Sequence, residues 1–158
     1  MRYLILLFAF VAMCAVADTK QIIFECKAGF IPDGDTVFVE GGKYDGKRIR
    51  LKGIDAPERT QAFSRKSQKM LLQKIKRKTL KVVVHELDKY DRFLGTIYLG
   101  DRNINREMVA EGWAWAYTYK GFTELYEAEM KKARADKLGL WQDKSPEAPW
   151  DFRRKQKN

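Results

Sequence analysis

Residues 33–58 read DGDTVFVEGGKYDGKRIRLKGIDAPE, and this segment predicts a β-hairpin with an acidic turn at each end. Alternating apolar and polar residues predict one strand over Thr36–Glu40 and a second over Lys47–Gly53, joined by the glycine-rich turn 41–46. The polar face of the second strand is basic and carries Arg48, Arg50 and Lys52. The two ends of a hairpin lie side by side. Four acidic residues at those ends are therefore expected to converge: Asp33, Asp35, Asp55 and Glu58.

The bulk composition describes one globular domain with a basic surface. The chain has 158 residues, which suits a single core. Hydrophobic residues make up 45% and charged residues 33%, a balance that excludes an intrinsically disordered chain. The formal net charge of +10 favours a polyanionic partner such as nucleic acid. Many basic proteins, however, bind no acidic ligand in particular.

The N-terminal residues 1–17 are predicted to be a secretory signal peptide. Arg2 precedes an apolar run that ends in the small-x-small triplet Ala15-Val16-Ala17. The run is shorter than the roughly 20 residues that a membrane span needs. Cleavage after Ala17 would release the chain to the periplasm or the medium, without a membrane span. Cys14 leaves lipoprotein processing as a minority alternative, and Cys26, the one thiol that remains, is expected to be a buried apolar residue.

Residues 18–142 are predicted to form one α+β domain. Five strands are expected, over residues 21–30, 36–40, 47–53, 80–87 and 94–99. Three helices are expected, over 61–78, from Asn105 to Gly112, and from an N-cap at Thr123 to Gly139. These strand lengths fit a small closed or partly open barrel with packed helices. Residues 143–158 hold two prolines and a basic run, and are predicted to be a mobile basic tail.

The helix predicted over 61–78 carries charges of one sign. Its polar face carries Arg65, Lys66, Lys69, Lys74, Lys76 and Arg77, and no acidic residue occurs between Arg59 and His85. Such a run is most often a solvated face. A face without compensating acids gains nothing for folding, so binding of a polyanion is the alternative interpretation.

Carboxylates and arginines are the candidate chemical groups that remain after elimination. His85 is the single histidine and lies in a strand pattern, where a structural role is the more common one. The sequence has no Cys/His metal spacing and no phosphate-cradling glycine loop. Either acidic turn alone would be explained by loop geometry. Together with Arg50 and Arg92 they provide what a phosphodiesterase needs: oxygen ligands for a hard cation, a carboxylate to activate water, and guanidinium groups for the transition state.

The sequence resembles the staphylococcal nuclease (thermonuclease) family. Five segments match in family order and at compatible spacing: Ile31-Pro32-Asp33-Gly34-Asp35-Thr36, Arg50-Leu51-x-x-Ile54-Asp55-Ala56-Pro57-Glu58, Asp88-Lys89-Tyr90-x-Arg92, Asn105-x-x-Met108-Val109-x-x-Gly112 and Lys137-Leu138-Gly139-Leu140-Trp141. Together they span nearly the whole chain after the signal peptide. The combination is far more specific than any one segment.

The resemblance implies an OB-fold barrel of five strands with three helices, and a Ca²⁺-dependent nuclease that cleaves DNA and RNA to leave 3′-phosphate ends. It implies that Asp35, Asp55 and the carbonyl of Ala56 hold Ca²⁺, with Asp33 supporting these ligands from behind. Glu58 would be the general base. Two arginines would bind the scissile phosphate and stabilise the transition state: Arg50 and Arg92. Four residues match the region that contacts the terminal phosphate and base: Lys89, Tyr90, Tyr117 and Tyr119.

Some positions depart from the family pattern. Ala56 replaces a threonine, a change that a backbone ligand tolerates. Asp91 replaces a glycine beside Arg92 and adds a negative charge there, which affects the expected placement of Arg92. Tyr117 and Tyr119 lie in an alternating aromatic segment, so packing is an equal alternative to base contact.

Three functional hypotheses follow. The first is a monomeric, secreted or periplasmic Ca²⁺-dependent endonuclease that prefers single-stranded or denatured substrate, because stacking on aromatic side chains needs unpaired bases. The second is a non-catalytic OB-fold module that binds nucleic acid without turnover. The third is a basic envelope protein that binds an acidic surface without a metal. The joint presence of the carboxylates and both arginines favours the enzyme.

Overall fold

The computed structural model describes residues 21–118 and 125–157. Three predictions therefore fall outside the described residues: the signal peptide over 1–17, the helix cap at Thr123, and Tyr119. Within the described ranges, every helix is too short or too polar to cross a bilayer.

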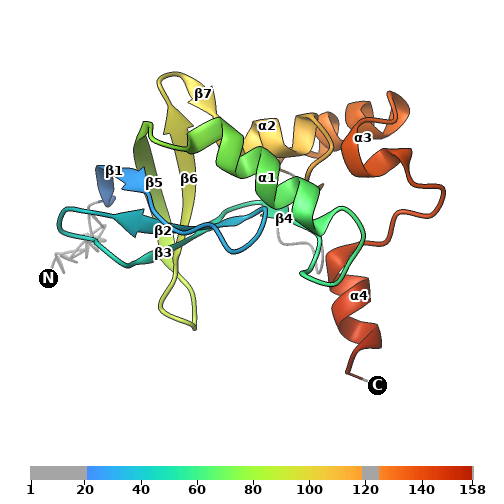
Figure 1. The fold of residues 1–158 in the computed structure, drawn as a ribbon, viewed down its shortest axis with the longest axis horizontal. Coiled ribbons are helices and arrows are strands. Elements are labelled where there is room, and N and C mark those ends of the chain that lie inside the picture. The colour runs from blue at the N-terminus through green and yellow to red at the C-terminus, as the bar shows by residue number, and fades with distance from the viewer. Residues whose placement is uncertain (1–20, 119–124, 158) are drawn as a thin grey trace, which may run out of the picture.

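Five strands form a closed barrel, as predicted. They are β1 (Ile23–Ala28), β2 (Thr36–Glu40), β3 (Arg48–Leu51), β5 (Thr79–Leu87) and β6 (Phe93–Leu99). Their order in the sheet is β3-β2-β1-β5-β6, and a parallel pairing of β3 with β6 closes the ring. The other pairings around the ring are antiparallel, so the barrel is mixed and has the OB-fold architecture. Figure 1 shows the barrel on one side of the molecule and most of the helices on the other.

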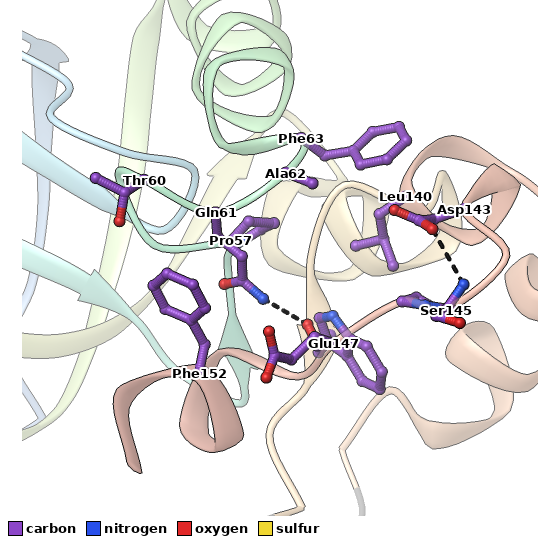
Figure 2. Close-up of a pocket in the computed structure, with 12 residues that line it drawn as sticks. Pro57, Thr60, Gln61, Ala62, Phe63, Leu140, Asp143, Ser145, Glu147 and Phe152 are labelled. Carbon is purple, nitrogen blue, oxygen red and sulfur yellow. Dashed lines mark hydrogen bonds between the residues drawn. The ribbon is translucent and has the colours of Figure 1, made fainter. Parts of the chain in front are cut away.

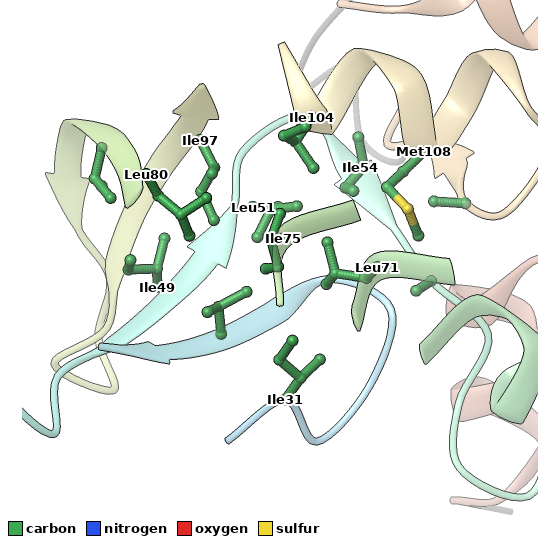
Figure 3. Close-up of a cluster of buried hydrophobic side chains, with 14 of the residues drawn as sticks. Ile31, Ile49, Leu51, Ile54, Leu71, Ile75, Leu80, Ile97, Ile104 and Met108 are labelled. Carbon is green, nitrogen blue, oxygen red and sulfur yellow. The ribbon is translucent and has the colours of Figure 1, made fainter. Parts of the chain in front are cut away.

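The barrel core follows from the alternation of the strands. Val37 and Ile49 are register partners in the hairpin of β2 and β3, and both are fully buried. Leu80 and Val82 line the same interior from β5, and Ile97 from β6. Figure 3 shows Ile49, Leu80 and Ile97 in one buried cluster with residues of the helices, among them Leu71 and Ile75. Burying a side chain of this size stabilises the fold by about 1.5–3 kcal/mol.

The described residues form four α-helices and one short 3₁₀ helix, so the predicted number of three helices is one too low. They are α1 (Ser64–Ile75), α2 (Ile104–Ala110), α3 (Glu127–Ala135), the 3₁₀ helix η2 (Gly139–Gln142) and α4 (Pro149–Lys155). Three two-residue strands complete the fold: β4 (Ile54–Asp55), β7 (Arg102–Asn103) and β8 (Trp115–Ala116).

Helix α1 is shorter than predicted, and its basic face is not wholly solvated. Phe63 precedes it in the left-handed region, at φ 65°, which starts the helix three residues late. Leu71 and Ile75 are fully buried. Lys74 is also buried, and its ammonium donates to Glu107 at 2.8 Å and to Glu111 at 2.6 Å. Since both acids belong to the α2 segment, this charge connects two helices.

Asn105 links α2 to the barrel. Its side chain is fully buried; Oδ1 accepts from the backbone N–H of Ile97 at 3.1 Å, and Nδ2 donates to the carbonyls of Lys52 and Gly95 at 3.0 Å each. Both N–H donors of the amide and one acceptor position of its oxygen therefore have a partner. The helix begins earlier than predicted because Asn103 is its N-cap and accepts from the backbone N–H of Arg106.

Residues 143–157 do not form the mobile tail that the sequence predicts. They contain α4, which begins at Pro149, a favoured first residue of a helix. Trp150 of α4 contacts the rings of Trp115 and Tyr117, with centroids 5.6 and 5.8 Å apart. The prediction was wrong because composition alone does not reveal that an aromatic residue in the segment has a partner elsewhere in the chain.

Two isolated polar residues have the structural roles that the sequence predicts. Cys26 is buried in the core, and burial raises the pKa of its thiol to about 11, which makes it a poor nucleophile. His85 lies in β5, and its Nε2 is 2.9 Å from the hydroxyl of Thr96 in β6.

Candidate functional site

The hairpin brings the two acidic turns together. Asp35 directly precedes β2, Asp55 ends β4, and Arg50 lies between them in β3. The register pairs Thr36 with Arg50, and the carbonyl of Asp35 accepts from the backbone N–H of Leu51 at 2.8 Å. The position of each acid is therefore set by backbone hydrogen bonds.

Arg50 joins the two carboxylates. Its Nη2 donates to Asp55 Oδ1 at 2.8 Å and lies 3.1 Å from Asp35 Oδ2. Its Nη1 donates to the carbonyl of Ile54 at 2.9 Å and to that of Leu51 at 3.2 Å. One nitrogen is thus in contact with both acids, which confirms that Asp35, Asp55 and Arg50 converge. The guanidinium is held in the fork geometry that suits phosphate or carboxylate oxygens.

The turn of Asp33 and Asp35 is fixed from several sides. Asp33 Oδ1 accepts from the backbone N–H of Asp35 at 3.1 Å, so Asp33 fixes the backbone that carries Asp35. Asp35 Oδ2 accepts from the backbone N–H of Ala56 at 2.6 Å, which connects the two acidic turns directly. Gly34 is required here, because a Cβ would lie 1.8 Å from Ser67 Oγ of α1.

Both central carboxylates are removed from solvent. Asp35 is 5% exposed and Asp55 only 1%. Burial raises the pKa of Asp35 to about 7, and the Arg50 guanidinium opposes this rise. Burial also raises the pKa of Asp55 above its ordinary value, opposed by Arg153 and Arg50. A buried pair of acids is charged only with cations beside it, so the site is built to hold positive charge.

Glu58 lies on the loop that follows β4. Its backbone N–H donates to Gln61 Oε1 at 3.0 Å and its carbonyl accepts from the backbone N–H of Gln61 at 2.7 Å, which fixes the loop. The side chain is 36% exposed, and Oε1 accepts from Arg153 Nη1 at 2.5 Å. This carboxylate therefore reaches solvent beside the buried pair, as a general base needs to.

Arg153 is a site residue that the sequence does not predict. It comes from α4, and its Nη2 donates to Asp55 Oδ2 at 2.8 Å while Nη1 donates to Asp55 Oδ1 at 3.2 Å. Two signals indicate a helix around it, namely Pro149 at a first helical position and Trp150 three residues before the arginine. No local pattern indicates its partner, because Asp55 is 98 residues away in the chain.

Arg92 lies on the same side of the barrel as Arg50, but its guanidinium pairs with Asp88. It directly precedes β6, and the parallel register pairs Arg50 with Leu94. Side chains two residues apart share a face, so Arg92 is on the face of Arg50. Its Nε donates to Asp88 Oδ2 at 2.7 Å, and Asp88 Oδ1 accepts from the backbone N–H groups of Tyr90 and Arg92. The structure therefore places Arg92 on the same face of the barrel as Arg50, with its guanidinium on Asp88.

Asp91 and Arg92 each have a charged partner elsewhere. Its backbone has a φ of 57°, a conformation that glycine adopts without strain and aspartate tolerates. Its carboxylate accepts from Lys47 Nζ at 2.5 Å, whereas Arg92 pairs with Asp88. The substituted position therefore has its own cationic partner.

Three of the four residues predicted to contact the substrate lie in the described ranges. Tyr90 is 59% exposed, with the ammonium of Lys89 5.1 Å and the guanidinium of Arg92 5.4 Å from its ring centroid. Tyr117 instead packs against Trp150, and its backbone N–H donates to the carbonyl of Gly53 at 2.9 Å. The exposed Tyr90 is available for stacking, and Tyr117 contributes to packing.

The donor set fits a hard cation in part. The carboxylates of Asp35 and Asp55 lie together with arginine and backbone donors on their oxygens, and oxygen donors of this kind suit Ca²⁺ or Mg²⁺. Among the described residues, no group of three acidic, histidine or cysteine side chains forms a ready-made metal site. Further ligands of a cation here have to be water or substrate oxygens.

A cavity of about 180 Å³ adjoins the site on the side of α4. Its walls come from the loop after Pro57, from the segment before α4, and from Phe152 of α4. Figure 2 shows Gln61 reaching across to Glu147, where its Nε2 donates to the backbone carbonyl at 2.6 Å. The loop that carries Glu58 is thereby connected to the C-terminal segment.

Sequence comparisons find known proteins that are similar to this chain. Residues 48–143 match the family described as staphylococcal nuclease homologue. The chain is 36% identical over 154 residues to an "Uncharacterized endonuclease" of Haemophilus influenzae, covering 96% of this chain and 84% of that protein. It is 41% identical over 140 residues to a "Micrococcal nuclease" of Shigella flexneri, covering 81% and 79%. It is also 40% identical over 112 residues, 70% of this chain, to a "Probable staphylococcal-like nuclease CAN3" of Oryza sativa, of which it covers 29%.

Proposed function

This chain belongs to the staphylococcal nuclease homologue family, and from that premise we propose that it is a calcium-dependent endonuclease. Its substrates are DNA and RNA, with little sequence specificity, and its products carry 3′-phosphate ends. One observation carries the proposal. Arg50 contacts Asp35 and Asp55 at 3.1 and 2.8 Å, with Glu58 on the loop that immediately follows.

We assign the side chains the roles that the family resemblance implies, and their positions support this assignment. Asp35, Asp55 and the carbonyl of Ala56 would hold the cation, and Asp33 fixes the turn of Asp35 by accepting from its backbone N–H. When bound, Ca²⁺ neutralises charge on the phosphate and acidifies a coordinated water. Glu58, which reaches solvent at 36% exposure, orients the attacking water and accepts its proton.

The arginines bind the scissile phosphate. Two backbone carbonyls fix the position of Arg50, and its Nη2 exchanges a carboxylate for a phosphate oxygen when the substrate binds. Arg92 lies on the same face and reaches the phosphate after it leaves Asp88. Both stay charged at any working pH and therefore stabilise the extra charge of the five-coordinate transition state.

The substrate contacts favour unpaired nucleic acid. Tyr90 is exposed, with the cations of Lys89 and Arg92 close to its ring, an arrangement that suits a stacked base next to a phosphate. Stacking accepts any base, which agrees with low sequence specificity. We propose that the protein acts as a monomer, outside the cytoplasm after cleavage near Ala17.

A chelator assay tests the enzyme against the binding module. The purified chain should degrade denatured DNA with added Ca²⁺ and stop when a chelator removes it. Glu58→Gln should lower the rate by about 100-fold or more, whereas Glu86→Gln, an exposed acid paired with Lys52, should not. DNA binding without cleavage would support the non-catalytic module. Full activity in chelator would remove the metal from the mechanism, and a fully active Glu58→Gln variant would remove the general base.

A further inference from the structure

Helix α4 is docked so that one of its residues reaches the acidic cluster. The short antiparallel pair of β4 and β8 places Asp55 opposite Trp115. Trp150 of α4 packs on Trp115 with a ring-centroid distance of 5.6 Å. Residues three apart share a helix face, so Arg153 extends from the same face as Trp150. The aromatic contact therefore directs Arg153 towards Asp55.

Arg153 covers the oxygens that a cation would use. Its two terminal nitrogens donate to Asp55 Oδ1 and Oδ2 at 3.2 and 2.8 Å, and Arg50 donates to Oδ1 as well. Arg153 also holds Glu58 Oε1 at 2.5 Å. One guanidinium thus occupies a proposed metal ligand and the proposed general base at once.

We propose that Arg153 is a further residue of the catalytic site, which competes with the cation for Asp55 and so sets the affinity for calcium. The proposal rests on the proposed function. A guanidinium fork and a divalent cation cannot both occupy the two oxygens of one buried carboxylate, and their like charges repel. The release of Arg153 is thus a condition for loading the site.

The two guanidinium groups differ in their freedom to leave. Arg50 is 16% exposed and is fixed by two backbone carbonyls of the barrel, so it stays. Arg153 is 39% exposed and belongs to a C-terminal helix of 7 residues. The energy of its charged hydrogen bonds is lost when the cation binds, and this loss weakens the apparent affinity for calcium.

Calorimetric titration of the purified chain with Ca²⁺ tests the competition directly. Arg153→Ala should bind Ca²⁺ about tenfold more tightly than the parent, and Arg153→Lys, which loses the fork, should lie between them. The matched control is Arg154→Ala, which removes the same charge from the next residue; Arg154 pairs with Asp151 inside α4. Its affinity should stay within about twofold of the parent.

Unfolding temperatures supply a second readout. In chelator, Arg153→Ala should be less stable than the parent, since Asp55 and Glu58 lose a partner, and saturating Ca²⁺ should abolish that difference. An equal loss with and without Ca²⁺ would show a purely structural ion pair and overturn the proposal. So would an Arg153→Ala affinity no tighter than that of Arg154→Ala. Absence of Ca²⁺ binding in every protein, the parent included, would instead refute the proposed metal and the inference with it.

Discussion

Replacement of Asn105 by alanine should destabilise the domain more than any surface change. The side chain is fully buried and makes three hydrogen bonds to the backbone of the barrel. Asn105→Ala leaves the N–H of Ile97 and the carbonyl of Lys52 without these partners, whereas the carbonyl of Gly95 keeps the N–H of Lys52 as a donor. Each neutral bond contributes about 1 kcal/mol net, and a buried group left unsatisfied costs about 1–3 kcal/mol. Some relaxation is expected, so the loss should be about 3–5 kcal/mol, a large part of the stability of a single domain.

Urea unfolding at pH 7, followed by tryptophan fluorescence, measures this loss. The matched control is Asn103→Ala, which removes the N-cap of α2 and should cost about 1 kcal/mol. Asn105→Asp keeps an acceptor for Ile97 but cannot donate to the two carbonyls, so it should be at least as destabilising as alanine. A cost for Asn105→Ala no greater than that for Asn103→Ala would refute the reasoning.

Three further predictions use other parts of the molecule. Arg102, together with Lys74, holds the pKa of Glu107 at about 2, below its ordinary 4.5. Glu107→Gln should therefore lower the free energy of unfolding by about 1–2 kcal/mol at pH 7. Urea titrations should show that this loss shrinks as the pH falls from about 4.5 towards 2. Gly112 has a φ of 74°, and a Cβ there would lie 2.3 Å from the carbonyl oxygen of Leu138. At Gly100 the φ is also positive, but no other atom would lie within 4 Å of a Cβ. In thermal unfolding, Gly100→Ala should therefore cost about 1 kcal/mol of stability and Gly112→Ala well over that. Arg50→Lys keeps the charge but loses the fork, and steady-state rates at saturating Ca²⁺ should fall about 100-fold or more.

The barrel and the centre of the site could be predicted because both depend on local patterns. Alternation over Thr36–Glu40 and the glycine turn that follows specify a hairpin, and a hairpin necessarily brings its ends together. The contacts of Arg50 with Asp35 and Asp55 at 3.1 and 2.8 Å are the consequence. The five strands of the barrel are confirmed for the same reason, since each carries its own period-two pattern.

Charged residues with distant partners could not be predicted in this way. Lys74 resembles the rest of a basic helix face, yet it is buried against Glu107 and Glu111, 33 and 37 residues further along. Arg153 resembles one charge of a solvated tail, yet it covers Asp55. A sequence pattern indicates which face of an element is polar. It does not indicate which polar residue is enclosed when two elements pack.

The enclosed charges mean that the proposed cation binding at this site is an exchange. Asp35 and Asp55 are 5% and 1% exposed, so they need positive charge beside them before any metal arrives. Arg50 and Arg153 supply it. A cation that binds Asp55 therefore replaces a guanidinium already there, and its affinity is the difference between two strong interactions. Arg50 is fixed by the hairpin, whereas Arg153 is positioned by the packing of α4. Helix α4, which the sequence does not predict, is therefore the element that can change the affinity for the cation.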